Sequence, residues 1–196
     1  MLYIFGDSHA CSSFKNLQVP HENIYQSSVT MFRIGRDNTI INYNLDMDIT
    51  RNTILLCYGE VDCRCHIGKQ VNLGRNEDTV INELVSDYFK TITNNIKNAK
   101  VIIASVIPPT SQIEYEIMNG PILHEFPFVN SDEDRVRYTN KVNNKIEELC
   151  LLNNYIYFDG YSFCRRDTGT LSYEFSDNSV HLQDNILFID NFYNIL

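Results

Sequence analysis

Short apolar runs that alternate with helical stretches are the feature that most constrains the fold of this 196-residue chain. The amino-terminal run, Leu2 to Phe5, and the clearest run, Thr53 to Tyr58, are each followed directly by glycine and an acidic residue. Unbroken apolar runs of this length are typical of strands that are buried on both faces of a parallel sheet. The other strand candidates are Ile24 to Met31, Lys100 to Val106 and Tyr155 to Asp159.

The stretches between these runs have the periodicity of amphipathic helices. Apolar residues recur every three or four positions from Asn76 to Ile96 and again from Ser131 to about Leu152. A shorter terminal helix is expected from about Gln183 to Tyr193. Because strands that alternate with helices form right-handed crossovers, we expect an α/β fold, a three-layer α/β/α arrangement with a mostly parallel, five-stranded sheet.

The length of the chain predicts a single domain over residues 1–196. One long interruption, an aromatic-rich insertion at about 108–130, begins with Pro108 and Pro109 and has no sustained periodicity. An insertion of this length is either a substrate lid or a packed surface loop, and the residues leave both interpretations open.

Charge and cysteine content exclude several classes of protein. The formal net charge of −9 repels polyanions, so nucleic acid is not an expected partner. Six cysteines in a chain of this length do not make a disulfide framework. The first apolar run is too short for a signal peptide or a membrane span. We therefore expect a cytoplasmic protein with no membrane partner, whose oligomeric state the sequence does not define.

Polar residues at the expected strand ends are candidates for catalysis. Reactive groups in open α/β sheets lie just beyond the carboxyl ends of the strands, where Ser8 and the segment Glu60 to Asp62 are found. Ser8 is expected at the start of a helix, where free N–H groups stabilise an oxyanion. His181, in a polar loop before the terminal helix, is the candidate base, and Asp177 is the candidate group that orients it.

Gly6-Asp7-Ser8, together with Asp177 and His181, resembles the SGNH (GDSL-like) hydrolase superfamily over nearly the whole chain. The resemblance implies the flavodoxin-like form of the α/β/α fold. It also implies acyl transfer through a Ser8 nucleophile, with His181 as its base and Asp177 as the orienting acid. The N–H groups of Ser8, Gly35 and Gly59 would then form the oxyanion hole.

Three family blocks depart from the usual pattern. His9 replaces a leucine after the serine, and Asp177 lies four residues before His181 instead of three. The third block, usually Gly-x-Asn-Asp, has Val61 in place of the asparagine that donates to the oxyanion. Because the loss of one donor costs about 3 to 4 kcal/mol, either a neighbour such as Arg64 substitutes or the protein hydrolyses slowly.

Slow hydrolysis favours transfer of the acyl group to a bound hydroxyl or amine. Family members include carbohydrate acetyltransferases and deacetylases, and the segment Gly59 to Arg64 resembles a subgroup associated with surface-polysaccharide assembly. The resemblance implies acetyl transfer to a sugar or sugar nucleotide, with acetyl-coenzyme A as co-substrate and no tightly bound cofactor. Two alternatives stay open: a carbohydrate esterase or deacetylase, and a catalytically lapsed glycan-binding module.

Several charged residues are candidates for substrate binding. Arg33, Arg36 and Arg64 would suit the phosphates of a sugar nucleotide, and the alternative is that they pair with surface carboxylates. Arg64 either forms an ion pair with Asp62 or reaches the substrate. Glu60 and Asp62 are further binding candidates, and the residue type of Glu60 also fits a catalytic carboxylate.

A cluster of cysteine and histidine residues follows the third block. Cys63-Arg64-Cys65-His66 lacks the spacing of common zinc sites, so no metal is expected, and we interpret the segment as a structured active-site loop. The histidines other than His181 are interpreted as surface or hydrogen-bonded residues: His9, His21, His66 and His124.

Overall fold

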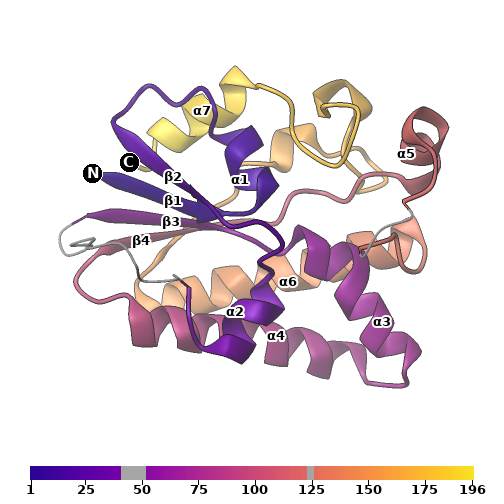
Figure 1. The fold of residues 1–196 in the computed structure, drawn as a ribbon, viewed down its shortest axis with the longest axis horizontal. Helices are drawn as coiled ribbons and strands as arrows, with labels where there is room; N and C mark the ends of the chain where they lie inside the picture. Colours follow the sequence, from indigo (N-terminus) through magenta and orange to yellow (C-terminus); the bar gives the residue numbers. More distant parts are fainter. Residues whose placement is uncertain (41–51, 123–125) are drawn as a thin grey trace.

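A parallel sheet of five strands lies at the centre of the computed structural model, which describes residues 1–40, 52–122 and 126–196 (Figure 1). The strands are β1 (Leu2–Gly6), β2 (His21–Tyr25), β3 (Thr53–Cys57), β4 (Lys100–Ala104) and β5 (Ile156–Phe158). Their order is β2-β1-β3-β4-β5, and every described pair is parallel. This is the α/β fold with the flavodoxin-like strand order that the sequence predicts.

Helices cover both faces of the sheet and complete the three layers. Figure 1 shows α1 (Ser8–Ser13) and α7 (Ile186–Tyr193) on one face, with α2 (Met31–Asp37), α4 (Glu77–Asn95) and α6 (Asp132–Asn153) on the other. Adjacent residues of β3 alternate between two apolar clusters, Leu55 packing beneath α1 and α7 and Leu56 beneath α4 and α6. A strand buried on both faces must be apolar at every position, which explains its unbroken run.

The register of the sheet brings three strand ends to one edge. Gly6 of β1 lies opposite Tyr25 of β2 and Cys57 of β3, so the segments that follow these residues leave the sheet together. A Cβ at Gly6 would lie 2.4 Å from the Cβ of Ala10 and 2.6 Å from the carbonyl oxygen of Cys57. Only glycine fits at this position, which allows α1 to start close against the sheet.

The predicted strand over Ile24 to Met31 exists, but its bounds were wrong. β2 ends at Tyr25, and Met31 begins α2, whose N-cap Thr30 accepts a hydrogen bond from the N–H of Arg33 at 3.1 Å. The run appeared continuous because the apolar end of an edge strand is followed, after a short loop, by the apolar first turn of a helix.

The segment predicted as a loop after β3 is also helical. A π-helical turn, η1 (Asp62–His66), continues directly into α3 (Ile67–Asn72). Cys63, Cys65 and Ile67 are buried, and the N–H of Cys63 bonds to the carbonyl of Gly59 at 3.0 Å. The cysteines therefore belong to the core of a helical turn.

The insertion at 108–130 contains a helix of eight residues, α5 (Gln112–Asn119), none of which is buried. Residues 123–125, which include His124, lie outside the described residues. The lid and loop interpretations of this insertion both remain predictions. Across the described ranges, no helix has both the length and the apolar character needed to cross a membrane.

Candidate active site

Ser8, His181 and Asp177 lie together at the carboxyl edge of the sheet. The Nε2 atom of His181 is 2.9 Å from Ser8 Oγ, and its Nδ1 atom is 2.9 Å from Asp177 Oδ2. Ser8 is the first residue of α1, and the side chain of the N-cap Asp7 accepts a bond from the N–H of His9 at 2.9 Å. The structure thus brings a hydroxyl, an imidazole and a carboxylate into the hydrogen-bonded order of a serine-hydrolase triad.

A tight loop explains how an acid four residues before His181 reaches its ring. Ser176 and Leu182 form an antiparallel bridge, and the N–H of Asp177 bonds to the carbonyl of His181 at 3.0 Å. Asp177 Oδ1 accepts from the N–H of Ser179 at 2.9 Å, which leaves Oδ2 for the imidazole. Asn178 has a φ of 66°, a left-handed conformation that asparagine tolerates.

A second histidine lies beside the triad. The His9 ring centroid is 4.6 Å from that of His181, and His9 is 4% exposed. Its Nε2 atom is 3.3 Å from Glu60 Oε2, whereas its Nδ1 atom has no partner within the described ranges. His9 is therefore neither a surface residue nor a fully hydrogen-bonded one, which corrects the sequence interpretation. The sequence feature that could have revealed this environment is the position of His9 directly after the candidate nucleophile.

Glu60 and Arg64 form a buried ion pair below this histidine. Arg64 Nε is 2.7 Å from Glu60 Oε1, and Nη2 is 3.1 Å from Oε2. Arg64 Nη1 donates to the carbonyl of Phe126, and its side chain is 7% exposed. Arg64 therefore pairs with Glu60 and not with Asp62, so that alternative is wrong, while its roles at the substrate and at the oxyanion stay predictions.

Asp62 has a structural role at the start of α2. Its carboxylate accepts the N–H of Met31 at 2.8 Å and that of Phe32 at 3.3 Å, and it lies 3.1 Å from His66 Nδ1. A carboxylate at this end of a helix satisfies free N–H groups and interacts favourably with the helix dipole. Asp62 and Glu60 are both buried and hydrogen-bonded to protein groups, and their predicted substrate-binding roles stay predictions.

The charges around the triad shift the pKa values of both histidines. Burial lowers the pKa of His181, the charge of His9 lowers it further, and Asp177 opposes both effects without cancelling them. Burial would also lower the pKa of His9, but Asp7 and Glu60 outweigh it and raise this pKa. For Glu60, burial is outweighed by Arg64 and His9, which hold its pKa below the ordinary value. The lowered pKa of His181 favours its neutral form, which can accept a proton.

Replacement of His9 by glutamine is expected to move the acidic limb of the kcat/KM profile to higher pH. The change removes a positive charge beside His181, so the pKa of His181 rises towards its ordinary value. The profile is measured with p-nitrophenyl acetate from about pH 5 to pH 8. His66→Gln is the matched control, because His66 contacts Asp62 and not the triad. An acidic limb that is the same in His9→Gln and wild type would contradict the coupling.

The structure separates the predicted oxyanion residues. Gly35 is the fifth residue of α2, beyond the free N–H groups of the first turn, and a Cβ there would lie 2.9 Å from the Cβ of Asp87 in α4. Helix packing therefore explains Gly35, and its predicted oxyanion role is wrong. Gly59 has a φ of 116° at the end of β3, and Ser8 provides an N–H at the start of α1. The roles of Gly59 and Ser8 stay predictions.

Sequence reasoning missed Ser28, which lies in the loop between β2 and α2. Its φ of 58° is in the left-handed region that glycine favours and that other residues rarely adopt. No sequence signal marks this conformation, because serine is common in ordinary turns.

Arg33 and Arg36 lie on α2 and line a cavity that neither Ser8 nor His181 lines. Arg36 bonds to Asp37 through two nitrogens, at 2.7 and 3.0 Å, as the carboxylate-pairing alternative predicts. Arg33 is 3.6 Å from the same carboxylate, and its side chain is 53% exposed.

Solved structures with a similar fold include lipolytic enzymes. The chain is 15% identical to a GDSL-like lipase from Bacteroides thetaiotaomicron (TM-score 0.59, covering 98% of this chain and 83% of that one). It is 10% identical to phospholipase A1 from Streptomyces albidoflavus (0.55, 98% and 98%) and 14% identical to a G-D-S-L family lipolytic protein from Veillonella parvula (0.54, 100% and 97%). A scan against family models and a search of curated proteins gave no match.

At these identities the likeness establishes the fold. The chain has the fold of the SGNH (GDSL-like) hydrolases, as the residues around Ser8 and His181 predicted.

Proposed function

We propose that this protein is a serine-dependent ester hydrolase or acyltransferase. The observation that carries the proposal is the chain of two 2.9 Å contacts from Ser8 Oγ through His181 to Asp177. This distance is within the hydrogen-bond reach that a general base requires. The shared fold with proteins described as GDSL-like lipases and phospholipase A1 supports the proposal.

In this mechanism His181 Nε2 takes the proton of Ser8 as Oγ attacks the acyl carbonyl. The N–H groups at the start of α1 stabilise the oxyanion that forms. His181 then returns the proton to the leaving group, and an acyl-Ser8 intermediate remains. A water or an acceptor hydroxyl or amine, deprotonated by the same imidazole, attacks this intermediate, and the imidazolium returns the proton to Ser8 Oγ as the acyl–oxygen bond breaks. Asp177 stabilises the imidazolium in both steps.

Besides the N–H groups at the start of α1, this site has fewer candidate oxyanion donors than a typical hydrolase. Val61 has no side-chain donor, and Arg64 is already bound to Glu60 and to the Phe126 carbonyl. Ser28 is a better candidate than Gly35 for the second donor, because it has a glycine-like φ in the loop directly after β2. A weaker oxyanion hole favours slow hydrolysis.

Slow hydrolysis leaves time for an acceptor to intercept the acyl-Ser8 intermediate. We therefore assign the finer function as transfer of an acetyl group from acetyl-coenzyme A to a sugar or sugar nucleotide. A carbohydrate esterase or deacetylase is the second candidate, because the same triad can use water. The intact hydrogen bonds of the triad favour both over a lapsed glycan-binding module.

Covalent labelling tests the proposed nucleophile directly. A fluorophosphonate probe is expected to modify Ser8 in the wild-type protein, because His181 activates the hydroxyl, and the modified peptide is identified by mass spectrometry. His181→Ala is expected to label much more slowly, while Ser12→Ala, on the same helix, is expected to label at the wild-type rate. An unlabelled Ser8 would favour the lapsed binding module.

The amounts of free acetate and of acetylated sugar that form distinguish a transferase from an esterase. The protein is incubated with acetyl-coenzyme A, with and without a panel of amino sugar nucleotides, and both acetate and acetylated sugar are quantified. A transferase is expected to release acetate slowly alone and to form acetylated sugar when the acceptor is present. Fast release of acetate from p-nitrophenyl acetate or an acetylated sugar, with no acceptor product, would identify the esterase.

A further inference from the structure

The carboxylate of Glu60 is held by a guanidinium that is itself anchored on two sides. Arg64 donates to both Glu60 oxygens, with Nε 2.7 Å from Oε1 and Nη2 3.1 Å from Oε2. Its Nη1 atom donates to the carbonyl of Phe126, and its own carbonyl accepts from the N–H of Val129 at 3.0 Å. The guanidinium carbon lies 5.7 Å from the ring centroid of Phe128. Glu60 therefore cannot turn away from this position without breaking two hydrogen bonds to a fixed partner.

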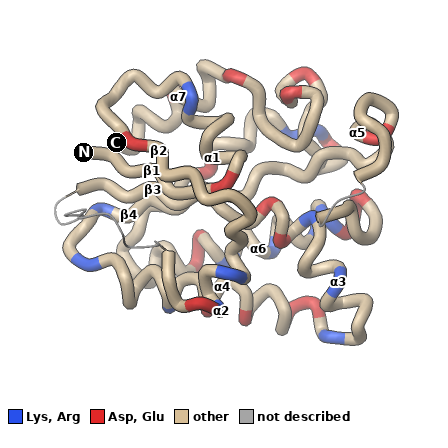
Figure 2. Tube along the Cα trace, in the orientation of Figure 1, with Lys and Arg blue, Asp and Glu red and all other residues tan. Residues whose placement is uncertain are grey.

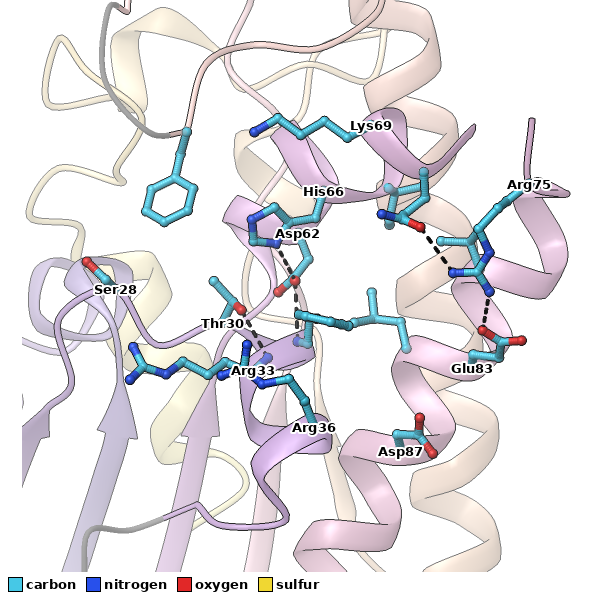
Figure 3. Close-up of a pocket in the computed structure, with 16 residues that line it drawn as sticks. Ser28, Thr30, Arg33, Arg36, Asp62, His66, Lys69, Arg75, Glu83 and Asp87 are labelled. Carbon is cyan, nitrogen blue, oxygen red and sulfur yellow. Dashed lines mark hydrogen bonds and ion pairs between the residues drawn. The ribbon is translucent and has the colours of Figure 1, made fainter. Parts of the chain in front are cut away.

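The same carboxylate faces His9. Glu60 Oε2 is 3.3 Å from His9 Nε2, and neither residue is more than 5% exposed. Figure 3 shows the cavity of about 710 Å³ between α2, η1, α3 and α4. Phe126 belongs to the lining of this cavity, whereas Glu60 and His9 do not. Of the two charged neighbours of Glu60, His9 is thus the one that leads to the triad.

His9 connects Glu60 to the catalytic histidine. The ring centroids of His9 and His181 are 4.6 Å apart, with an angle of 50° between the ring planes. His9, Glu60 and Arg64 are each at most 6% exposed, and charges interact more strongly in buried surroundings than in water. A change in the charge of Glu60 therefore alters the protonation of His9, and the charge of His9 in turn acts on His181.

Groups of both signs surround His9 and determine whether its ring is protonated. Asp7 lies two residues before it, Glu60 and Arg64 reach it from the segment after β3, and His181 reaches it from the loop before α7. Figure 2 shows acidic positions beside the start of α1. Asp7 and Glu60 raise the pKa of His9, whereas burial and Arg64 lower it. Burial raises the pKa values of the other titratable residues around the small cavity beside His9, so they are uncharged: Cys57, Tyr58 and Tyr161.

Stability does not explain why a histidine occupies this buried position. The Nδ1 atom of His9 has no partner within the described ranges, and a buried polar atom without a partner destabilises a fold. The family that the chain resembles usually has a leucine here, which would bury no polar atom. A buried polar atom of this kind calls for another explanation, and the contact of His9 with His181 provides one.

We propose that Glu60 is a positioning residue for the catalytic base, and that it acts on His181 through His9. Glu60 holds the protonated ring of His9 beside His181, and the charge of this ring opposes protonation of the base. The assignment of His181 as the base rests on the proposed function, which the inference deepens. The charge coupling itself rests on the contacts among the three side chains.

The direction of one pKa change distinguishes this indirect effect from a direct one. The negative charge of Glu60 by itself raises the pKa of His181, so its removal alone would lower that pKa. Its removal also takes away one of the two acids that keep His9 protonated, and the charge of His9 affects His181 more than that of Glu60 does. Glu60→Gln is therefore expected to raise the pKa of His181.

Histidine titrations followed by NMR on the full chain test the proposal. Glutamine keeps the size of the Glu60 side chain and one oxygen that accepts hydrogen bonds, and circular dichroism checks that the variant is folded. The pKa of His181 is expected to rise in Glu60→Gln and in His9→Gln, whereas Glu60→Gln is expected to cause no further rise in the His9→Gln background. Glu77→Gln is the matched control, because it removes a carboxylate from an ion pair with Arg137 elsewhere in the chain, and no change is expected.

Two further measurements accompany these titrations. The acidic limb of the kcat/KM profile for p-nitrophenyl acetate is expected to move to higher pH in Glu60→Gln, as the pKa of His181 does. Wild type provides a measurement that does not depend on the folding of any variant. Its His9 resonance is expected to titrate with a pKa above the ordinary value.

Four outcomes would overturn the inference. They are an unchanged or lower pKa of His181 in Glu60→Gln, an equal rise in Glu77→Gln, an equal rise in the His9→Gln background, and a wild-type His9 pKa below the ordinary value. Any of these, with ester hydrolysis that still requires Ser8, would remove this inference alone. The expected pKa changes without Ser8-dependent hydrolysis or Ser8 labelling would instead remove the proposed function.

Discussion

Replacement of Ser8 by alanine is expected to lower kcat for p-nitrophenyl acetate on the order of 10⁴-fold. The change removes the hydroxyl that His181 contacts at 2.9 Å, and with it the covalent route. Stability is expected to change little, because the N-cap of α1 is Asp7 and its bond to the N–H of His9 remains. The measurements are steady-state kinetics and thermal unfolding of the same preparations.

Ser12→Ala provides the control for the Ser8 variant. It removes a hydroxyl from the same helix without touching the triad, so full activity is expected. Activity of Ser8→Ala equal to wild type would end the assignment of Ser8 as nucleophile, whatever the stability of the variant.

Replacement of Glu60 by leucine is expected to lower the free energy of unfolding by about 3 to 5 kcal/mol. Glu60 is the partner of both Arg64 and His9, and the change leaves an uncompensated guanidinium in a buried position. Urea denaturation followed by circular dichroism measures the effect. A loss below about 1 kcal/mol, the usual size for an exposed pair, would show that the pair is not buried in solution.

The double variant Glu60→Leu, Arg64→Met shows how much of the stability loss comes from the unpaired charge and how much from lost packing. Because it removes both members of the pair, it is expected to recover part of the stability that Glu60→Leu loses. The folded pKa of Glu60 lies below its ordinary value, so the carboxylate stabilises the fold fully above that ordinary value. This contribution is lost as the pH falls through the pKa of Glu60 in the folded state. The difference in free energy of unfolding between wild type and Glu60→Leu should therefore become smaller in acid.

Much of the fold could be predicted because burial on both faces leaves a strong signal in the sequence. β3, β4 and the long helices α4 and α6 have unbroken or periodic apolar patterns, and the structure has them close to the predicted positions. β2 is an edge strand with mostly exposed residues, so its apolar pattern was too weak to separate it from α2.

The partners of the site residues were harder to predict than the residues themselves. Ser8 and His181 were found from residue type and expected position at strand ends and loops, and the structure brings them together. The alternative that pairs Arg64 with Asp62 depends on a loop conformation for this segment, and it is wrong. In the helical turn that forms, residues four apart share a face, which selects Glu60.

Backbone conformation was the other limit of sequence reasoning. The family resemblance matches Gly35 to a glycine of the oxyanion hole, but in the structure Gly35 makes room for α4. The glycine-like φ instead belongs to Ser28, whose conformation is imposed by the loop between β2 and α2. Residue type alone does not reveal where a fold forces an unfavourable φ.

Ser8 and His181 are 173 positions apart, and β1, which leads to Ser8, lies between β2 and β3. A chain that has folded only its first four strands would therefore hold the hydroxyl in place without a base to activate it. Acquisition of esterase activity during refolding should coincide with docking of the segment that carries His181. Under the proposed function, turnover therefore reports whether the segment that carries His181 has docked against the sheet.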